Sequence, residues 1–192
     1  MPSLSEADRQ SLLELARRAI AEAVSPPKPA GGIPHRGVFA EKRGVFVTLH
    51  ARGRLRGCIG VLEALEPLGE SITRCAASAA FEDPRFSPVS QEELGELQIE
   101  LSLLSPAEPI LPENIEIGKH GLLISQAAKR GLLLPQVAVQ HKLSREQFLE
   151  ETCRKAGLAL EAWKEPETQI LGFTCEVFSE TATGLNSATQ NS

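Results

Sequence analysis

Two short segments of alternating polar and apolar residues, joined by a glycine-containing turn, constrain the fold of this 192-residue chain more than any other feature. In Val45–His50 every second side chain is a valine or a leucine, and Leu55–Val61 alternates in a similar way. This period of two is typical of β-strands that bury one face. Because residues 51–53 form a short loop that ends in glycine, the two strands are predicted to pair as an antiparallel hairpin.

The register of this hairpin is predicted from the faces of its strands. Pairing His50 with Arg54 across a three-residue loop keeps the apolar side chains on one side, whereas a two-residue loop mixes the faces. In this register Arg56 lies opposite Thr48, and Cys58 follows on the same face. The pattern therefore predicts a polar face that carries Thr48, Arg56 and Cys58, and a one-residue bulge is the irregularity that would undo it.

The rest of the chain is predicted to contain helices and further strands of an α+β fold. The expected helices are 4–24, 67–83 and 144–155, and the expected strands are 38–41, 45–50, 55–61, 97–105, 115–117, 122–124, 132–134 and 170–178. Residues 25–34 are rich in proline and glycine, which interrupt helices, so they are expected to form a linker. The predicted division is an N-terminal helix and linker over 1–34, an α+β domain over 35–178 on which the helix packs, and a disordered polar tail over 179–192.

The four cysteines are predicted to be reduced thiols rather than disulfide or metal ligands. A domain of this size needs neither a disulfide nor a zinc ion to fold, and the spacing of the cysteines contains no pair typical of zinc ligands. Cys75, Cys153 and Cys175 fall on apolar faces and are predicted to be core residues. Cys58 alone falls on a polar strand face. With no signal peptide and no membrane segment in the sequence, a reduced, cytoplasmic location is expected.

The net charge of −5 is unevenly distributed along the chain. Residues 35–60 contain six basic groups and one acidic group, whereas residues 61–116 contain two basic and twelve acidic groups. Either the two stretches lie against each other and screen one another, or the basic stretch forms an anion site. Aromatic residues are only 4% of the chain, so few side chains are available to form a surface on which nucleotide bases stack. Nucleic-acid binding therefore depends on the basic stretch alone.

The hairpin resembles the signature of the AMMECR domain family. The sequence LRGCIG at 55–60 carries this resemblance, together with the preceding strand at 45–49. Further segments agree in the expected order, namely AAFEDPRF at 79–86, the strand at 99–105, GKHGL at 118–122, LLPQVA at 133–138 and ETCRKAGL at 151–158. The resemblance covers about residues 5–178.

This resemblance implies a compact α+β protein with a largely antiparallel sheet, packed helices and two unequal lobes in one domain. It also implies partners, because prokaryotic members are often encoded with a Memo-like protein and a radical-SAM protein, as protein A of the AmmeMemoRadiSam system. It attaches no reaction and no cofactor to the domain. The chemistry of a site must therefore be sought in the residues themselves.

The polar residues of these motifs supply the candidate site. Cys58 is the candidate nucleophile because nearby guanidinium groups favour a thiolate, and His120 is the candidate base. The residues predicted to bind a ligand or a partner are Thr48, Arg56, Gly57, Gly60, Asp83, Arg85 and Gln136. Glycines in a strand allow close approach of another group to the backbone. Glu100, on the polar face of its strand, is a further candidate acid or base.

Three functions are consistent with these residues. The first is a ligand- or partner-binding component that acts with Memo-like and radical-SAM proteins through the face carrying Arg56 and Cys58. The second is an enzyme that uses Cys58 as a reactive thiol with His120. The third is a regulator that binds nucleic acid. Motifs for dinucleotide binding, for a Walker phosphate loop and for a zinc protease are missing from the sequence, which argues against those classes.

Overall fold

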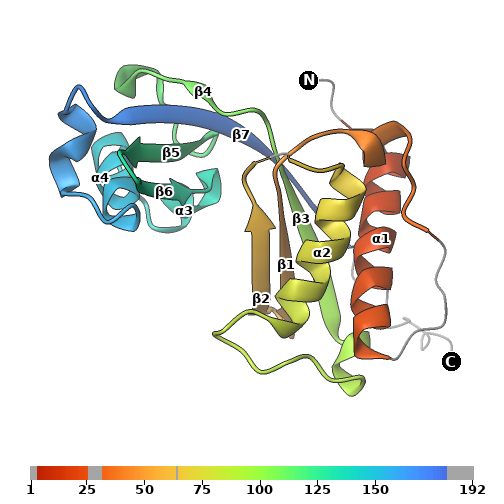
Figure 1. Ribbon diagram of the computed structural model, residues 1–192. Helices are drawn as coiled ribbons and strands as arrows, with labels where there is room; N and C mark the ends of the chain where they lie inside the picture. The colour runs from red at the N-terminus through yellow and green to blue at the C-terminus, as the bar shows by residue number, and fades with distance from the viewer. Residues whose placement is uncertain (1–3, 26–31, 64, 181–192) are drawn as a thin grey trace, which may run out of the picture. The chain divides into compact units, whose positions relative to one another are not determined.

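The computed structural model describes residues 4–25, 32–63 and 65–180, and its fold is of the α+β class. The chain divides into two compact units (Figure 1). The first contains the described residues up to 103 and those from 177 onward, and the second contains residues 104–176. The domain limits predicted at residues 34 and 179 stay predictions, because much of the linker and nearly all of the tail lie outside the described residues.

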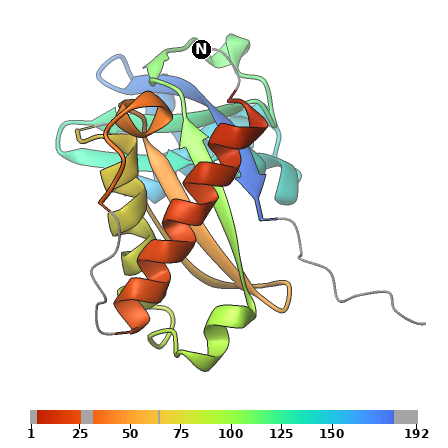
Figure 2. The same cartoon turned by 90° about the vertical axis from the view of Figure 1, so that its right-hand side faces the viewer.

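In the first unit, two helices cover one face of an antiparallel sheet. The helices are α1 (Glu6–Val24) and α2 (Leu68–Phe81), and the strands are β1 (Val45–Ala51), β2 (Arg54–Val61) and β3 (Leu97–Leu104), with short 3-10 helices η1 (Gly37–Ala40) and η2 (Glu92–Gly95). The strand order is β2-β1-β3, with both neighbours antiparallel to β1. Figures 1 and 2 show α1 and α2 side by side on the same face of this sheet.

The core of the first unit lies between the two helices and the sheet. The aliphatic residues of β1 are fully buried there, together with Leu12 and Ile20 of α1 and Ile72 of α2. Cys75 belongs to the same cluster, which confirms the prediction that it is a core residue. The alternation of β1 therefore turns Phe46, Thr48 and His50 toward the opposite face of the sheet, which we call the open face.

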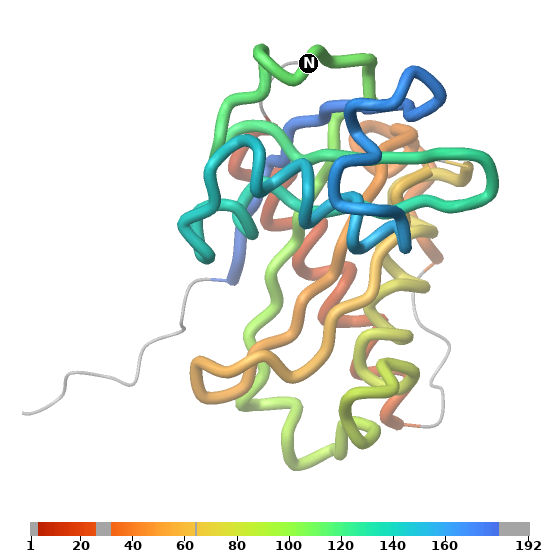
Figure 3. The backbone as a smooth tube through the Cα atoms, turned by 90° about the vertical axis from the view of Figure 1, so that its left-hand side faces the viewer, coloured from red at the N-terminus to blue at the C-terminus, as the bar shows by residue number. Residues whose placement is uncertain are grey.

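Figure 3 shows the hairpin turn as a bend of the orange tube. The turn differs from the predicted one, because its loop has only two residues. Ala51 pairs with Arg54, and the intervening Arg52 and Gly53 have positive φ angles of 51° and 73°. Two consecutive left-handed residues match the twist of the adjoining strands, which is why two-residue hairpin loops use them. A β-bulge follows and leaves Arg56 without a partner on β1.

The bulge changes which residues of the hairpin face one another. Cys58 lies opposite Thr48, whereas the predicted register placed Arg56 there. The predicted common face for Thr48 and Cys58 is confirmed, but the predicted pairing of Arg56 is wrong, and Leu55 is 41% exposed instead of facing the core. The two-residue loop shifts the pairing by one residue, and the bulge then restores the apolar alternation for the remainder of β2.

The second unit is a smaller sheet with its own helices. Its strands are β4 (Glu108–Pro109), β5 (His120–Gln126), β6 (Lys129–Leu133) and β7 (Gln169–Ser179), and its helices are α3 (Pro135–Gln140), α4 (Arg145–Lys155), η3 (Pro112–Asn114) and η4 (Leu160–Lys164). The last residues of β7 belong to the first unit. The strand order is β7-β5-β6, and β4 pairs with the other edge of β7. Phe148 and Cys153 of α4 are buried against Leu122 of β5, as predicted for Cys153.

Local signals placed the ends of α4 correctly. Ser144 accepts a hydrogen bond from the backbone N–H of Gln147, and the Gln147 side chain accepts one from the backbone N–H of Ser144. This is the predicted capping box, which satisfies two backbone donors at the start of a helix. Just beyond the helix, Gly157 takes a left-handed φ of 73°, as its predicted role in closing the helix requires.

Several predicted elements are corrected by the structure. Residues 37–40 form a 3-10 helix rather than a strand, and residues 115–117 form no strand, because the chain turns through Gly118 at a φ of 84°. Cys175 is half-buried rather than a core residue, and Val177 is 46% exposed. The apolar alternation of β7 therefore does not follow one core along the whole strand. Among the described residues, no helix is both long and apolar enough to span a membrane.

Candidate functional site

A row of three side chains crosses the open face of the first unit. Thr48, in the central strand β1, lies opposite Cys58 on β2 and opposite Glu100 on β3. The Thr48 hydroxyl donates to the Cys58 sulfur at 3.3 Å. All three residues are half-buried, so the row is neither sealed in the core nor fully solvated. Thr48 and Cys58 were predicted to bind a ligand and to react, respectively, and the structure brings them into contact.

Asp83 ties this row to the segment that follows α2. One of its carboxylate oxygens, Oδ2, accepts from the backbone N–H of Cys58 at 2.9 Å and from Nη2 of Arg85 at 2.6 Å. The other oxygen accepts from the backbone N–H and from Nε of Arg85, at 3.1 and 2.9 Å. Asp83 is only 4% exposed, whereas the Arg85 side chain is 54% exposed. A buried carboxylate thus fixes an exposed guanidinium beside the edge of β2.

The contacts of Asp83 keep it ionised. Hydrogen bonding to the Arg85 guanidinium holds the pKa of the Asp83 carboxyl well below its usual range, and the two backbone N–H donors act in the same direction against the desolvation of the group. The same ion pair raises the pKa of Arg85. Because the charged forms satisfy each other, the carboxylate can be buried without an uncompensated charge.

Arg56 takes part in a second ion pair. Its Nε donates to Oε1 of Glu93 at 2.9 Å, and its Nη2 donates to Oε2 of Glu93 at 3.1 Å and approaches the Pro88 carbonyl at 3.4 Å. This pairing raises the pKa of Arg56 and lowers that of Glu93. The Arg56 side chain is 13% exposed, and its Nη1 is buried without a hydrogen-bond partner among the described residues. Its observed contacts therefore fasten the 83–93 segment along β2.

The two glycines of the LRGCIG sequence have packing roles in the structure. A Cβ on Gly57 would lie 2.1 Å from the Ala79 carbonyl oxygen, so only glycine lets β2 approach α2 this closely. A Cβ on Gly60 would lie 2.4 Å from the ring of Phe46, which occupies that space on the open face. Their predicted role in binding a ligand stays a prediction.

The remaining predicted residues lie in the second unit. His120 begins β5, and its Nδ1 accepts from the backbone N–H of Glu116 at 3.0 Å, which orients the ring within its own turn. Gln136 lies in α3 and is half-buried. The structure thus gathers Thr48, Cys58 and Asp83 in the first unit with their neighbours, and places the predicted base in the other unit.

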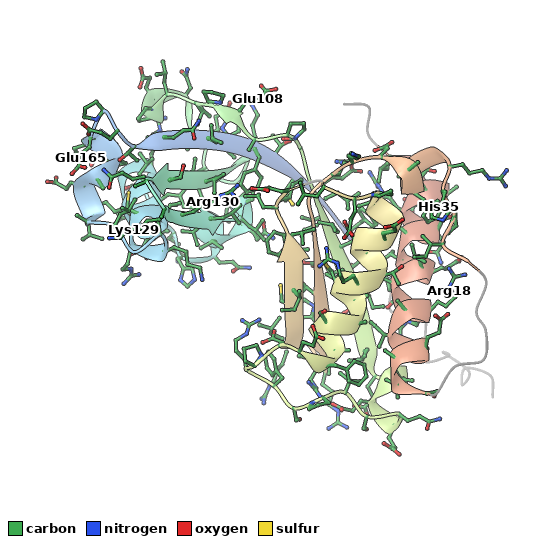
Figure 4. All side chains as sticks on the ribbon, in the orientation of Figure 1. Arg18, His35, Glu108, Lys129, Arg130 and Glu165 are labelled. Carbon is green, nitrogen blue, oxygen red and sulfur yellow. The ribbon has the colours of Figure 1, made fainter. Side chains whose placement is uncertain are left out.

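Two arginines of the basic stretch form ion pairs with the acidic stretch that follows it. In addition to Arg56 with Glu93, Arg52 pairs with Glu96 at 2.8 Å, which raises the pKa of Arg52. Other charged side chains, such as Arg18 and Lys129, are spread over both units (Figure 4). The interpretation in which the two stretches screen each other is therefore supported over a dense anion site in the hairpin. Among the described residues, no cluster of three or more His, Cys, Asp or Glu side chains is placed to hold a metal ion.

The roles of two acidic residues were not predicted from the sequence. Glu93 was not predicted to pair with Arg56, because an ion pair between residues 37 positions apart leaves no local pattern in the sequence. Glu100 was noted on the polar face of its strand, but its alignment with Thr48 depends on the pairing of β1 with β3. Alternation can assign a residue to a face, whereas only the register assigns its neighbours.

These features define a class of protein: an α+β protein with a row of polar side chains on a β-hairpin, whose outer strand is held by a buried aspartate that pairs with an arginine. The sequence profile of the AMMECR1 family matches residues 13–178. The chain is 41% identical over 187 residues to a protein of Methanothermobacter thermautotrophicus, an alignment that covers 92% of this chain and 96% of that one. It is 43% identical over 183 residues to a protein of Thermococcus kodakarensis, covering 88% of each.

A solved structure agrees with these matches. The crystal structure of an uncharacterised protein from Pyrococcus horikoshii superposes with a TM-score of 0.82 at 39% sequence identity, covering 92% of this chain and 93% of that one. The chain therefore belongs to the AMMECR1 family. The names of these relatives assign no activity.

Proposed function

We propose that this chain is a ligand- or partner-binding component, and that its binding surface is the open face around Thr48 and Cys58, with Arg85 at the edge. The observation that supports this most directly is the buried Asp83 carboxylate. Because Oδ2 binds both the Cys58 backbone N–H and the Arg85 guanidinium, it sets a thiol-bearing strand and an exposed cation at a fixed separation. A rigidly held set of polar groups is what recognition requires, since little ordering remains to oppose binding.

By family resemblance, the partners we propose are a Memo-like protein and a radical-SAM protein. Thr48→Arg adds bulk and charge to the open face without removing a core side chain, and it is expected to reduce co-purification of a co-expressed partner at least tenfold. Gln10→Arg places the same side chain on the exposed surface of α1 and serves as the control. Equal recovery of the partner with Thr48→Arg and with Gln10→Arg would contradict the proposal.

A second candidate function is an enzyme that uses the Cys58 thiol with His120 as base. It is favoured by one observation, that Cys58 is half-buried and receives the Thr48 hydroxyl, whereas Cys75 and Cys153 are buried. Burial in the cores raises the pKa of both Cys75 and Cys153, so neither is suited to act as a nucleophile.

Alkylation separates the two functions. Iodoacetamide labelling across pH, followed thiol by thiol by peptide mass spectrometry, is expected to modify Cys58 faster than Cys75. A nucleophilic role further requires Cys58 to react faster than the half-buried Cys175 at neutral pH, and Cys58→Ser to abolish the activity while the partner is retained. If Cys58 and Cys75 react at the same rate, the hypothesis that the chain is a cysteine-dependent enzyme is refuted, and the proposed binding function is unaffected.

A further inference from the structure

Glu100 is a carboxylate on the open face that has no partner in the part of the chain that the structure describes. It lies directly opposite Thr48 in the β1–β3 ladder and is half-buried. Among the described residues it makes no side-chain hydrogen bond and no ion pair. Nearby acidic side chains are paired, as Glu93 is with Arg56 and Glu96 is with Arg52. Because a partly desolvated carboxylate without a partner is costly, Glu100 is a group that an external cation would stabilise.

Thr48, which lies opposite Glu100 across the ladder, has an oxygen that can accept a further hydrogen bond. The Thr48 hydroxyl donates its hydrogen bond to the Cys58 sulfur, so the lone pairs of the hydroxyl oxygen can accept a hydrogen bond from another donor. Arg56, the cation predicted for this face, is held by Glu93 instead. Between Thr48 and Glu100, the surface therefore presents a hydroxyl oxygen and a carboxylate, and its complement is a positively charged hydrogen-bond donor.

The pairing register of the strands sets the distance that a ligand must span between Cys58 and Glu100. The Cys58 N–H turns outward to Asp83, so Cys58 and Thr48 form a pair without mutual backbone hydrogen bonds, whose Cα atoms are about 4.5 Å apart. On its other side Thr48 then forms a hydrogen-bonded pair with Glu100, at about 5.5 Å. The Cα atoms of Cys58 and Glu100 thus lie about 10 Å apart, a distance that a small molecule can span.

We propose that Thr48 and Glu100 form a subsite for the ammonium or guanidinium group of a small ligand whose other end lies over Cys58. This rests on the proposed function, because it assigns a ligand class to the same open face. Glu100 supplies the charge, Thr48 accepts a further hydrogen bond, and the half-buried setting strengthens both contacts relative to bulk water.

The first experiment uses the Cys58 thiol as a probe of the local charge. Its rates of disulfide formation are measured with a trimethylammonium-ethyl and a sulfonato-ethyl methanethiosulfonate, each of which transfers its thioalkyl group and releases methanesulfinate. Two charges about 10 Å apart in water predict that Glu100→Gln lowers the cation-to-anion rate ratio about fourfold. Glu113→Gln removes an exposed carboxylate of the second unit and leaves the ratio unchanged. An unchanged ratio with Glu100→Gln overturns the proposal.

The second experiment measures binding itself by amide chemical shifts. Titration with n-butylammonium is expected to give saturable shifts at Thr48 and Glu100, while n-butanol and butyrate give none, and Glu100→Gln abolishes the response. Equal shifts with butyrate or n-butanol refute a cation subsite. If Glu100→Gln instead reduces co-purification of the partner as strongly as Thr48→Arg does, the cation is a side chain of the partner, and the small-ligand assignment is wrong.

The two proposals can fail separately. If Thr48→Arg removes the partner but Glu100→Gln changes neither the rate ratio nor the amine response, the binding face stands and the cation subsite is refuted. If the amine response is present and depends on Glu100 while Thr48→Arg leaves partner association intact, the partner role is refuted and the subsite stands.

Discussion

Replacing Asp83 with asparagine tests the structural basis of the site. The substitution keeps the shape of the side chain but removes its charge. It also places an amide NH₂, which donates hydrogen bonds, where one carboxylate oxygen accepts them from N–H groups in the unmodified protein. Removing one partner from a buried ion pair costs about 3–5 kcal/mol, but Arg85 is 54% exposed and regains water, so we expect a loss of about 2–3 kcal/mol in the free energy of unfolding. For a chain of this length that corresponds to a decrease in Tm of roughly 4–12 °C.

The pH dependence of this difference has a defined sign. The pKa of Asp83 is lowered in the folded protein, mainly by the Arg85 guanidinium, so folding is favoured by its ionisation. The contribution is fully present above the pKa of the unfolded aspartate, about 3.9, and is lost as the pH falls below it toward the folded-state pKa. Asp83→Asn lacks this term, so the stability gap between the two proteins is constant near neutrality and narrows in acid.

Urea denaturation of the full chain at pH 7 and at pH 3 measures both effects. Glu113→Gln removes an exposed carboxylate and is the matched control, with an expected change below about 0.5 kcal/mol. Faster hydrogen exchange at the Cys58 amide is expected in Asp83→Asn, because that N–H loses its acceptor. A gap smaller than about 0.5 kcal/mol at pH 7, or a gap that does not narrow at pH 3, would refute the reasoning.

Three further predictions concern the packing and charge of the first unit. Gly57→Ala is expected to cost about 3 kcal/mol, because its Cβ would lie 2.1 Å from a backbone carbonyl oxygen of α2, while Gly95→Ala, with open space around it, changes the thermal melting curve little. Arg17→Met removes an ion pair with Glu180 and two hydrogen bonds to backbone carbonyls, so it is expected to lower stability by about 1–2 kcal/mol in urea denaturation. The loss is expected to exceed that of Arg18→Met, which removes an ion pair with Glu22 within the same helix. Because Arg52 and Arg56 of the basic stretch are paired with glutamates, the protein is expected to flow through a heparin column at physiological ionic strength. Retention on the column would favour the nucleic-acid-binding hypothesis.

Local patterns in the sequence predicted much of the fold. The two long helices, the main strands and the α4 capping box follow from periodicity and from short-range hydrogen bonding, which involve residues within a few positions of one another. The helix over 135–140 and the short β4 were missed, because such brief elements are stabilised by their neighbours more than by their own sequence.

The candidate site was predicted only in part from the sequence. Alternation placed Thr48 and Cys58 on one face, and the structure confirms that face. The same reasoning paired Arg56 with Thr48, and that pairing is wrong, because the sequence does not show which residue of a strand will bulge. Whether the basic stretch was an anion site or a screened surface depended on partners such as Glu93, 37 residues away.

By itself, the sequence determined the fold class, the polar face of the hairpin and the family resemblance, since these depend on the order and spacing of neighbouring residues. Only the tertiary structure decided that Asp83 holds the Cys58 backbone, that Arg56 is drawn to Glu93, and that Glu100 is aligned with Thr48 and unpaired among the described residues. The physical reason is that hydrogen bonds and ion pairs act over a few ångströms, and register and chain return bring distant residues within that range.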